Sequence, residues 1–212
     1  SIASQYRDNQ FHNFEHASHV TMSVSKLLSR IVAPDIDETD QNLASSLHDH
    51  TYGITSDPLT QFAVVLSALI HDVDHVGVPN FLLVEENAGL AAAYKNKSVA
   101  EQNSVDLAWQ TLMEPSFADL RHCIYDDTAD LKRFRQLLVN TVLATDIFDK
   151  ELQTLRKSRW AKAFDHQHAV SDKQEDVNRR ATIVIEHMIQ ASDVAHTMQH
   201  WHIYQKWNER LF

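Results

Sequence analysis

Residues 58–75 read PLTQFAVVLSALIHDVDH. Pro58 stands where the first turn of a helix tolerates proline, and the residues after it are apolar almost all round, which is typical of a helix at the centre of a domain. We therefore expect a helix over about 58–74, with Gly77 after its end. The residues expected to face the core are Phe62, Val65, Leu66, Leu69 and Ile70.

Helical periodicity continues on both sides of this stretch. An apolar stripe over 20–31 predicts a helix that Pro34 ends. Further helices are predicted at about 40–50, 98–113, 131–142, 148–163, 175–192 and 197–212. Ser98 and Glu101 have the spacing of a capping box. Because three Gly and four Pro are too few for the many turns of a β fold, the expected fold class is all-α, a compact multi-helix domain.

The domain organisation is expected to be simple. No repeat or Pro/Gly-rich linker divides the chain, so we expect one domain over residues 1–212, with a surface loop at 165–174. The chain begins a few residues before its first histidine cluster and ends inside a helical run without a C-cap signal. The domain is therefore expected to be incomplete.

Composition limits the partners and the compartment. The formal net charge of −10 disfavours binding to a nucleic acid polymer. The most apolar run, 62–70, is too short to span a membrane. Cys123 is the single cysteine and is expected to be buried or half-buried. One cysteine permits no disulfide within the chain, which predicts a cytoplasmic location, or the cytosolic face of a membrane protein.

Two histidine clusters and one distant acid could surround a divalent metal. The clusters are HNFEH at 12–16 and HDVDH at 71–75, and the acid is Asp193. On a helix, His12 and His16 would share one face roughly 6 Å apart, so one could bind metal while the other faces a substrate. Imidazole and carboxylate suit zinc, and carboxylate with water suits magnesium. Such a set favours metal-assisted hydrolysis of a phosphate ester.

Plainer explanations exist for each piece, and some other chemistries are disfavoured. A histidine pair can be a polar helix face, and Asp193 could be the N-cap of the last helix. Asn13 stands where a zinc protease of the His-Glu-x-x-His type needs its glutamate. No Gly-rich phosphate loop and no Gly-x-Ser-x-Gly motif is present.

Several motifs in order resemble those of a known family. Residues 71–82, HDVDHVGVPNFL, resemble the His-Asp-x-x-His-x-Gly-x-x-Asn motif of class I 3′,5′-cyclic nucleotide phosphodiesterases. Residues 11–17, FHNFEHA, resemble the Tyr-His-Asn-x-x-His-Ala motif of that family. Further matches follow at 87–91, 94–101, 143–146, 191–193 and 204–210. The resemblance covers nearly the whole chain.

The resemblance implies an all-helical, HD-type metallophosphohydrolase fold and metal-dependent hydrolysis of cAMP or cGMP to 5′-monophosphates. It implies a first ion, usually zinc, held by His16, His71, Asp72 and Asp193. Asp72 would bridge to a second ion, usually Mg²⁺ or Mn²⁺. A hydroxide held between the ions would attack phosphorus, and His12 would protonate the departing 3′ oxygen. Residues expected around the ligands and their waters are His75, Asn80, Glu101, Thr145 and Asp146.

The chain departs from the family pattern at several places. Phe11 replaces the usual tyrosine, and Asn103 and Ser104 replace a usual pair of histidines. The family residues that grip the base would lie beyond Phe212, so a preference for cAMP or cGMP is not predicted. Two alternatives stay open. One is an HD-type phosphohydrolase acting on another phosphate ester. The other is a non-catalytic or regulatory module, for instance in a receptor or cyclase fusion.

Overall fold

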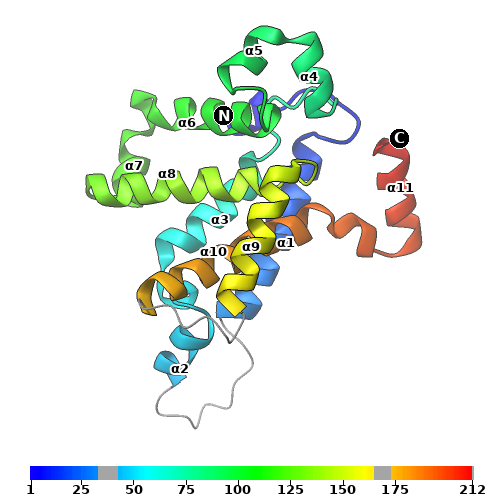
Figure 1. Cartoon of the computed structure of the whole chain (residues 1–212). Helices are drawn as coiled ribbons and strands as arrows, with labels where there is room; N and C mark the ends of the chain where they lie inside the picture. Colours follow the sequence, from blue (N-terminus) through cyan, green and yellow to red (C-terminus); the bar gives the residue numbers. More distant parts are fainter. Residues whose placement is uncertain (33–42, 165–172, 212) are drawn as a thin grey trace.

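The computed structural model describes residues 1–32, 43–164 and 173–211 (Figure 1). All regular structure in these ranges is helical, so the all-α prediction is confirmed. The helices are α1 Phe14–Val32, α2 Leu43–His50, α3 Pro58–Ile70, α4 Asn80–Glu86, α5 Ala88–Ala93, α6 Val99–Met113, α7 Ala118–Ile124, α8 Thr128–Leu143, α9 Lys150–Phe164, α10 Lys173–Asp193 and α11 Trp201–Leu211. Short 3₁₀ turns occupy Ile2–Gln5, Ile54–Ser56, Pro115–Phe117 and Ala195–Met198. None of the described helices is long and apolar enough to cross a membrane.

Helix α3 is the central element, as residues 58–75 predicted. Pro58 occupies its first turn, and the carboxylate of Asp57 caps it by accepting a hydrogen bond from Thr60 N at 3.1 Å. The helix packs against α1 on one side and α8 on the other (Figure 1). It ends at Ile70 rather than near 74, because the chain turns through residues 71–74, where Asp74 adopts a left-handed backbone conformation with φ 61°.

One residue expected in the core is not there. Phe62 is 41% exposed, and its ring lies at the edge of the core over Phe134, with ring centroids 6.0 Å apart. The fully buried face of α3 is formed mostly by small side chains, which allow neighbouring helices to approach closely. The buried residues are Thr60, Ala63, Val64, Ser67, Ala68 and Ile70.

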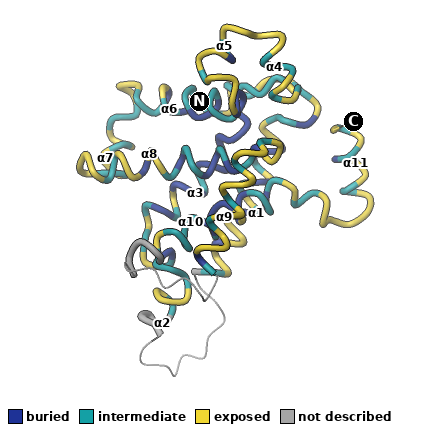
Figure 2. The backbone as a smooth tube through the Cα atoms, in the orientation of Figure 1, coloured by how far each residue is buried: buried dark blue, intermediate teal, exposed yellow. Residues whose placement is uncertain are grey.

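Two apolar clusters lie on opposite sides of α3. The first joins α3 to α1 and α10 and includes Val20, Val24, Leu28, Ile185 and Ile189. The second joins α3 to α6 and α8 and includes Val105, Ala108, Phe134, Leu138 and Val142. Figure 2 shows that the buried backbone runs through these central helices, whereas α9 and α11 are mostly exposed. Burying these side chains contributes most of the fold's stability.

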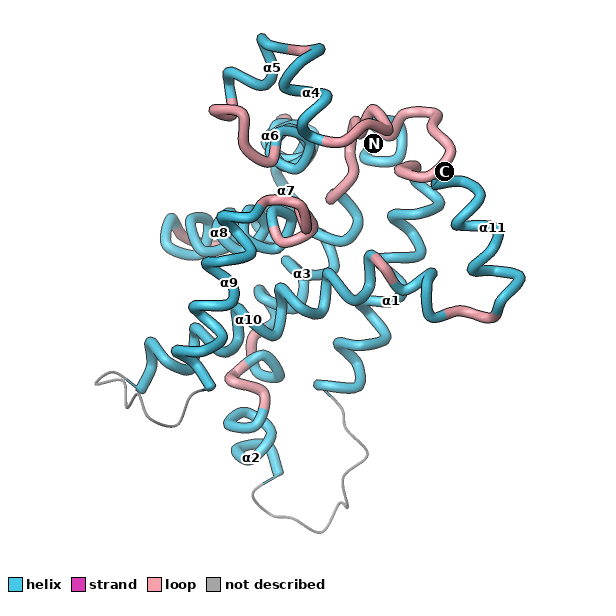
Figure 3. Tube along the Cα trace, turned by 45° about the vertical axis from the view of Figure 1, so that its right-hand side comes forward, coloured by secondary structure: helices cyan, strands magenta, loops and turns pink. Residues whose placement is uncertain are grey.

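The arrangement of helix ends matters for function. The N-terminal end of α1, the C-terminal end of α3 and the C-terminal end of α10 meet, because α1 and α10 both pack on α3. Helix α11 stands at the edge of the molecule, connected to α10 by the turn at Ala195–Met198 (Figure 3). Away from these ends, Cys123 is exposed rather than buried, because it lies on the short peripheral helix α7. Most of the loop predicted at 165–174 lies outside the described residues.

Candidate metal centre

Four side chains from three helix ends converge. His16 lies in the first turn of α1, His71 and Asp72 follow α3 directly, and Asp193 is the last residue of α10. His16 Nε2 is 3.0 Å from Asp193 Oδ1 and 3.7 Å from Asp72 Oδ2. His71 Nε2 is 3.4 Å and 3.3 Å from the same two oxygens. The two imidazoles and two carboxylates predicted from the sequence therefore face one small volume.

The hydrogen bonds around this cluster leave two of its inner atoms without a partner, although His16 Nε2 and Asp193 Oδ1 are hydrogen-bonded to each other. His71 Nδ1 is 2.9 Å from the carbonyl oxygen of Ala68, which turns the other ring nitrogen inward. Within the described part of the chain, His71 Nε2 and Asp72 Oδ2 are buried and have no hydrogen-bond partner. Buried polar atoms are rarely left unpaired, since each costs about 1–3 kcal/mol. A divalent cation would satisfy both atoms, and two nitrogen and two oxygen donors suit zinc.

Electrostatics point the same way. Burial by itself would lower the pKa of His71, but Asp72 and Asp193 outweigh it and raise this pKa well above its usual value. Burial opposes ionisation of Asp193 and Asp72, yet the neighbouring histidines hold the pKa of both carboxyls below the usual range. The site is thus built to hold positive charge beside two carboxylates. A divalent cation would take the place of the proton on His71.

His12 lies beside this cluster but not on a helix. Helix α1 begins at Phe14, so the expectation that His12 and His16 share one helix face is wrong. Their ring centroids are nevertheless 6.3 Å apart, because the turn at residues 11–13 folds against the helix. The His12 ring stacks on His75 with centroids 3.8 Å apart. Burial lowers the pKa of His12 to about 4, although Asp72 and Asp193 oppose this shift.

His75 is held by a tight turn. Its Nδ1 accepts a hydrogen bond from Gly77 N at 3.0 Å. Gly77 has φ +85°, a conformation that favours glycine. Burial lowers the pKa of His75, which favours the neutral form of its ring.

A buried hydrogen-bond network adjoins the cluster. Asn80 Nδ2 donates to Glu101 Oε2 at 2.9 Å and to Asp146 Oδ2 at 3.3 Å. Ser98 Oγ also donates to Asp146 Oδ2, at 2.8 Å. Burial, together with the nearby charge of Asp146, raises the pKa of Glu101 to about 7. Thr145 shares the turn of Asp146, and its hydroxyl donates to Val142 O at 2.8 Å.

Two expectations about single residues are wrong. Ser98 and Glu101 do not form a capping box, because Ser98 has a left-handed backbone (φ 40°) and makes no capping hydrogen bond. Its hydroxyl and the Glu101 carboxylate are used in the network instead. Asp193 is not an N-cap, since it ends α10 and its carboxylate faces His16.

The departures from the family pattern have structural partners. Asn103 Nδ2 donates to Asp74 Oδ2 at 3.1 Å, and Arg7 Nε pairs with Asp74 Oδ1 at 2.7 Å. Ser104 Oγ donates to Val73 O at 2.7 Å. These contacts hold the turn that carries His71 and Asp72. The sequence marked Asn103 and Ser104 only as unusual residues.

An aromatic wall covers His16 and was not predicted as part of the site. The ring of Phe11 lies 4.7 Å from that of His16, and the ring of Trp207 lies 5.9 Å from it. Both aromatic residues are buried. They limit the rotation of His16 and its access to water. The only signal in the sequence was the position of each residue within a family motif.

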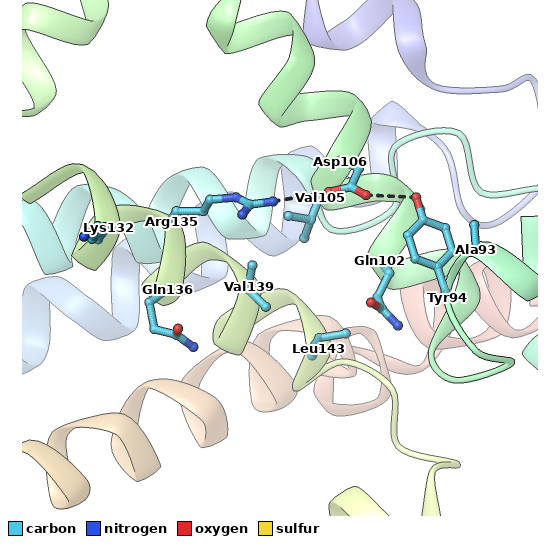
Figure 4. Close-up of a pocket in the computed structure, with 10 residues that line it drawn as sticks. All are labelled: Ala93, Tyr94, Gln102, Val105, Asp106, Lys132, Arg135, Gln136, Val139 and Leu143. Atoms are coloured by element: carbon cyan, nitrogen blue, oxygen red, sulfur yellow. Dashed lines mark hydrogen bonds and ion pairs between the residues drawn. The ribbon is translucent and has the colours of Figure 1, made fainter. Parts of the chain in front are cut away.

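A separate cavity of about 720 Å³ lies between α6 and α8 (Figure 4). On its rim, Asp106 accepts a hydrogen bond from Tyr94 Oη at 3.1 Å and lies 3.7 Å from Arg135. None of the residues of the metal centre lines this cavity. The size of this cavity does not indicate a reaction or a ligand. The metal centre, in contrast, has converging donor atoms, two of which are buried without a hydrogen-bond partner. We therefore place the candidate site at the metal centre.

Comparison with known proteins agrees with this geometry. Residues 11–212 match the model of the 3′5′-cyclic nucleotide phosphodiesterase family. The chain belongs to this family.

Among curated relatives of this phosphodiesterase family member, the Caenorhabditis elegans probable 3′,5′-cyclic-AMP phosphodiesterase pde-4 is 28% identical over 221 residues. The match covers 100% of this chain and 28% of that protein. The human cGMP-inhibited 3′,5′-cyclic phosphodiesterase 3A is 30% identical over 167 residues, covering 67% of this chain and 14% of the relative. The chain thus spans about a quarter of the first relative and less of the second.

The solved phosphodiesterase domain of Salpingoeca rosetta rhodopsin phosphodiesterase has the same fold. Its TM-score is 0.73 at 23% identity, over 99% of this chain and 55% of that domain's chain. A second structure, the phosphodiesterase domain of the RhoPDE fusion protein from the same organism, has a TM-score of 0.71 at 22% identity, over 99% of this chain and 57% of the other. These neighbours confirm the HD-like, all-helical fold.

Proposed function

We propose that this chain carries the metal centre of an enzyme that hydrolyses 3′,5′-cyclic nucleotides, cAMP or cGMP, to 5′-nucleoside monophosphates. The observation that carries the proposal is that two buried atoms, His71 Nε2 and Asp72 Oδ2, lie 3.3 Å apart without a hydrogen-bond partner inside a two-imidazole, two-carboxylate cluster. Family membership over residues 11–212 favours a cyclic nucleotide over another phosphate ester.

In this proposal, His16, His71, Asp72 and Asp193 would hold a first ion, zinc, and Asp72 would also serve a second, Mg²⁺ or Mn²⁺. Such ions supply Lewis acidity and activate a water nucleophile near neutral pH. The aromatic wall of Phe11 and Trp207 keeps His16 in one orientation.

His12 is proposed as the general acid that protonates the departing 3′ oxygen. The His12 ring lies beside the cluster, where it contacts the rings of His16 and His75. In this position it is available to donate a proton to a bound substrate. Burial disfavours its charged form, and an anionic phosphate beside it would favour that form again. Stacking on His75 fixes the plane of its ring.

Glu101 and its partners are proposed to hold the water around the ions. Asn80 donates to Glu101 Oε2, and burial raises the pKa of Glu101 to about 7 in the metal-free chain, a shift that bound cations would oppose. Asp146 accepts a hydrogen bond from Asn80, and Thr145 lies beside it in the same turn. His75 keeps the His12 ring in place.

The wider setting is also proposed. We propose that residues 1–212 act as one unit on the cytoplasmic side of the cell, within a longer protein with regulatory domains. Among the similar structures, the RhoPDE fusion protein from Salpingoeca rosetta carries its phosphodiesterase domain within a longer protein.

The test is release of 5′-AMP from cAMP and 5′-GMP from cGMP, with Mg²⁺ and trace Zn²⁺. Asp193→Ala should abolish product because it removes one ligand. His12→Ala should keep the metal but slow turnover about 10²–10⁴-fold, the usual size of general acid catalysis. Loss of bound zinc in His12→Ala would instead make His12 a ligand. No product from the wild type, with zinc bound, would support a non-catalytic module, and hydrolysis of other phosphate esters alone would support the HD-type alternative.

A further inference from the structure

The turn at the end of α8, residues 143–146, contains Thr145 and Asp146. Asp146 belongs to the hydrogen-bond network beside the metal centre. A helix ends with carbonyl groups that have no partner within the helix, and they carry partial negative charge. In this turn, side chains from two other helices supply the missing donors. Their identity was not predicted from the sequence.

Arg156 of α9 donates twice to the turn. Its Nη2 is 2.9 Å from Leu143 O, and its Nη1 is 3.3 Å from Asp146 O. The planar guanidinium can reach both carbonyls at once, which a lysine ammonium does less well. The cation also lies at the C-terminal end of α8, where the helix dipole favours positive charge.

Gln190 of α10 supplies a third donor. Its Nε2 is 2.7 Å from Ala144 O, between the two carbonyls that Arg156 engages. Gln190 lies three residues before Asp193 on the same helix. This hydrogen bond therefore ties the turn to the helix end that presents a candidate metal ligand.

The held turn reaches Glu101 through side-chain contacts. Asp146 Oδ2 accepts from Asn80 Nδ2, which also donates to Glu101 Oε2. If the 143–146 backbone shifts, Asp146, Asn80 and Glu101 shift with it, because they share these bonds. A misplacement of about 1 Å can cost an enzyme up to about 10²-fold in rate.

The packing of α9 against the rest of the protein depends little on Arg156. Of the α9 side chains, only Ala163 is fully buried, and none belongs to the two large apolar clusters. Arg159, one turn later, instead pairs with Glu186 of α10 at 2.7 Å. Removing Arg156 should therefore disturb the turn rather than the core.

We propose that Arg156 and Gln190 are positioning residues, which clamp the carbonyls of residues 143, 144 and 146 so that Asp146 holds Asn80, and through it Glu101, in a working geometry beside the metal centre. The proposal rests on the proposed function, because the geometry matters only if the centre hydrolyses its substrate.

The test compares Arg156→Met, Arg156→Lys and Gln190→Met with the wild type. We expect Arg156→Met to lower kcat about 10–100-fold with KM changed less than about threefold, and Arg156→Lys to recover part of the loss. Gln190→Met should lower kcat in the same sense. The amides of Phe148 and Asp149, which donate to Asp146 Oδ1, should exchange hydrogen for deuterium faster in Arg156→Met.

Two controls separate positioning from stability and charge. Lys157→Met makes the same change of charge at an exposed neighbour and should leave kcat within about twofold. Arg159→Met breaks the pair with Glu186 and should lower Tm without the fall in kcat. Unchanged amide exchange in Arg156→Met would overturn the clamp. Faster exchange with a wild-type kcat would overturn its role in catalysis. A wild-type chain without turnover would count against the proposed function, and the exchange measurement would still decide whether Arg156 holds the turn.

Discussion

In the metal centre, two buried atoms, His71 Nε2 and Asp72 Oδ2, have no hydrogen-bond partner within the described residues. In the adjoining network, both oxygens of Asp146 accept two hydrogen bonds each. Oδ1 accepts from the backbone of Phe148 and Asp149, and Oδ2 accepts from Asn80 and Ser98. Both regions are buried and both contain carboxylates.

This difference in hydrogen bonding indicates that the metal centre needs a ligand, whereas the network around Asp146 is complete without one. Buried charges are tolerated when they are paired, hydrogen-bonded or bound to metal. The network meets this condition with the chain's own donors, so it can hold a fixed geometry. The metal centre meets it only partly and would meet it fully with a cation. Substitutions in the two regions should therefore fail in different ways.

The largest effect is expected from Asp72→Ala. Loss of the proposed bridging carboxylate should reduce hydrolysis of cyclic nucleotides to background, because both ions would lose a ligand. It should also remove most of the zinc-dependent rise in stability, which for a bound ligand is about 2.7 kcal/mol at 100 times its Kd. Steady-state turnover and thermal melts with and without zinc measure both effects.

A matched control for this variant is Asp106→Ala, an acid on the rim of the separate cavity. It should retain both turnover and the effect of zinc. Retention of metal and turnover by Asp72→Ala would show that the ligand assignment is wrong.

Asp146→Ala should show the opposite pattern. Four donors would lose a hydrogen bond, and only Asn80 Nδ2 would keep another acceptor, Glu101, so the free energy of unfolding should fall by about 3–5 kcal/mol in the absence of metal. The zinc-dependent increment should persist, since Asp146 is not a proposed ligand. Urea unfolding with EDTA and with zinc measures the two quantities. If Asp146→Ala were as stable as the wild type, the network would not be the self-contained unit described above.

The smallest effect concerns the pH dependence of Glu101→Gln. Burial raises the pKa of Glu101 from 4.5 to about 7, so the folded metal-free protein binds more protons than the unfolded chain between these values. Stability should be fully present below pH 4.5 and should fall as pH rises to about 7. Glutamine at position 101 does not ionise, so the variant should not lose stability for this reason as the pH rises.

Glu101→Gln should therefore be more stable than the wild type at pH 8, by at most about 3 kcal/mol, and similar to it near pH 4.5. Unfolding free energies across this pH range, in the presence of EDTA, test the sign. The same variant should retain zinc binding. A difference that is constant with pH would mean that Glu101 titrates normally in the folded protein.

The outcome of sequence reasoning differed between elements. Residue type, spacing and motif order identified the candidate ligands, and the structure brings His16, His71, Asp72 and Asp193 together. Apolar periodicity located the longer helices and α2, but it missed the short helices α4, α5 and α7. Periodicity did not predict that Phe62 would lie at the edge of the core, since α3 is apolar all round and gives no preferred face.

Local sequence patterns also gave wrong predictions where a side chain bonds to a residue far away in the chain. Ser98 and Glu101 have capping spacing, but Asp146, in the segment after α8, and Asn80 of α4 compete for them. Arg156 and Gln190 have no motif of their own. Their role depends on carbonyl groups 13 and 46 residues away in the chain.

By itself, the sequence determined the helical class, the central position of α3 and the set of groups able to bind metal, because these depend on composition, periodicity and residue chemistry. The tertiary structure alone decided which buried atoms are left unpaired, which acids are satisfied and which residues hold the turn after α8. Those properties depend on distances between segments far apart in the chain, and such distances are set when α1, α8 and α10 pack on α3 and α9 packs on α10.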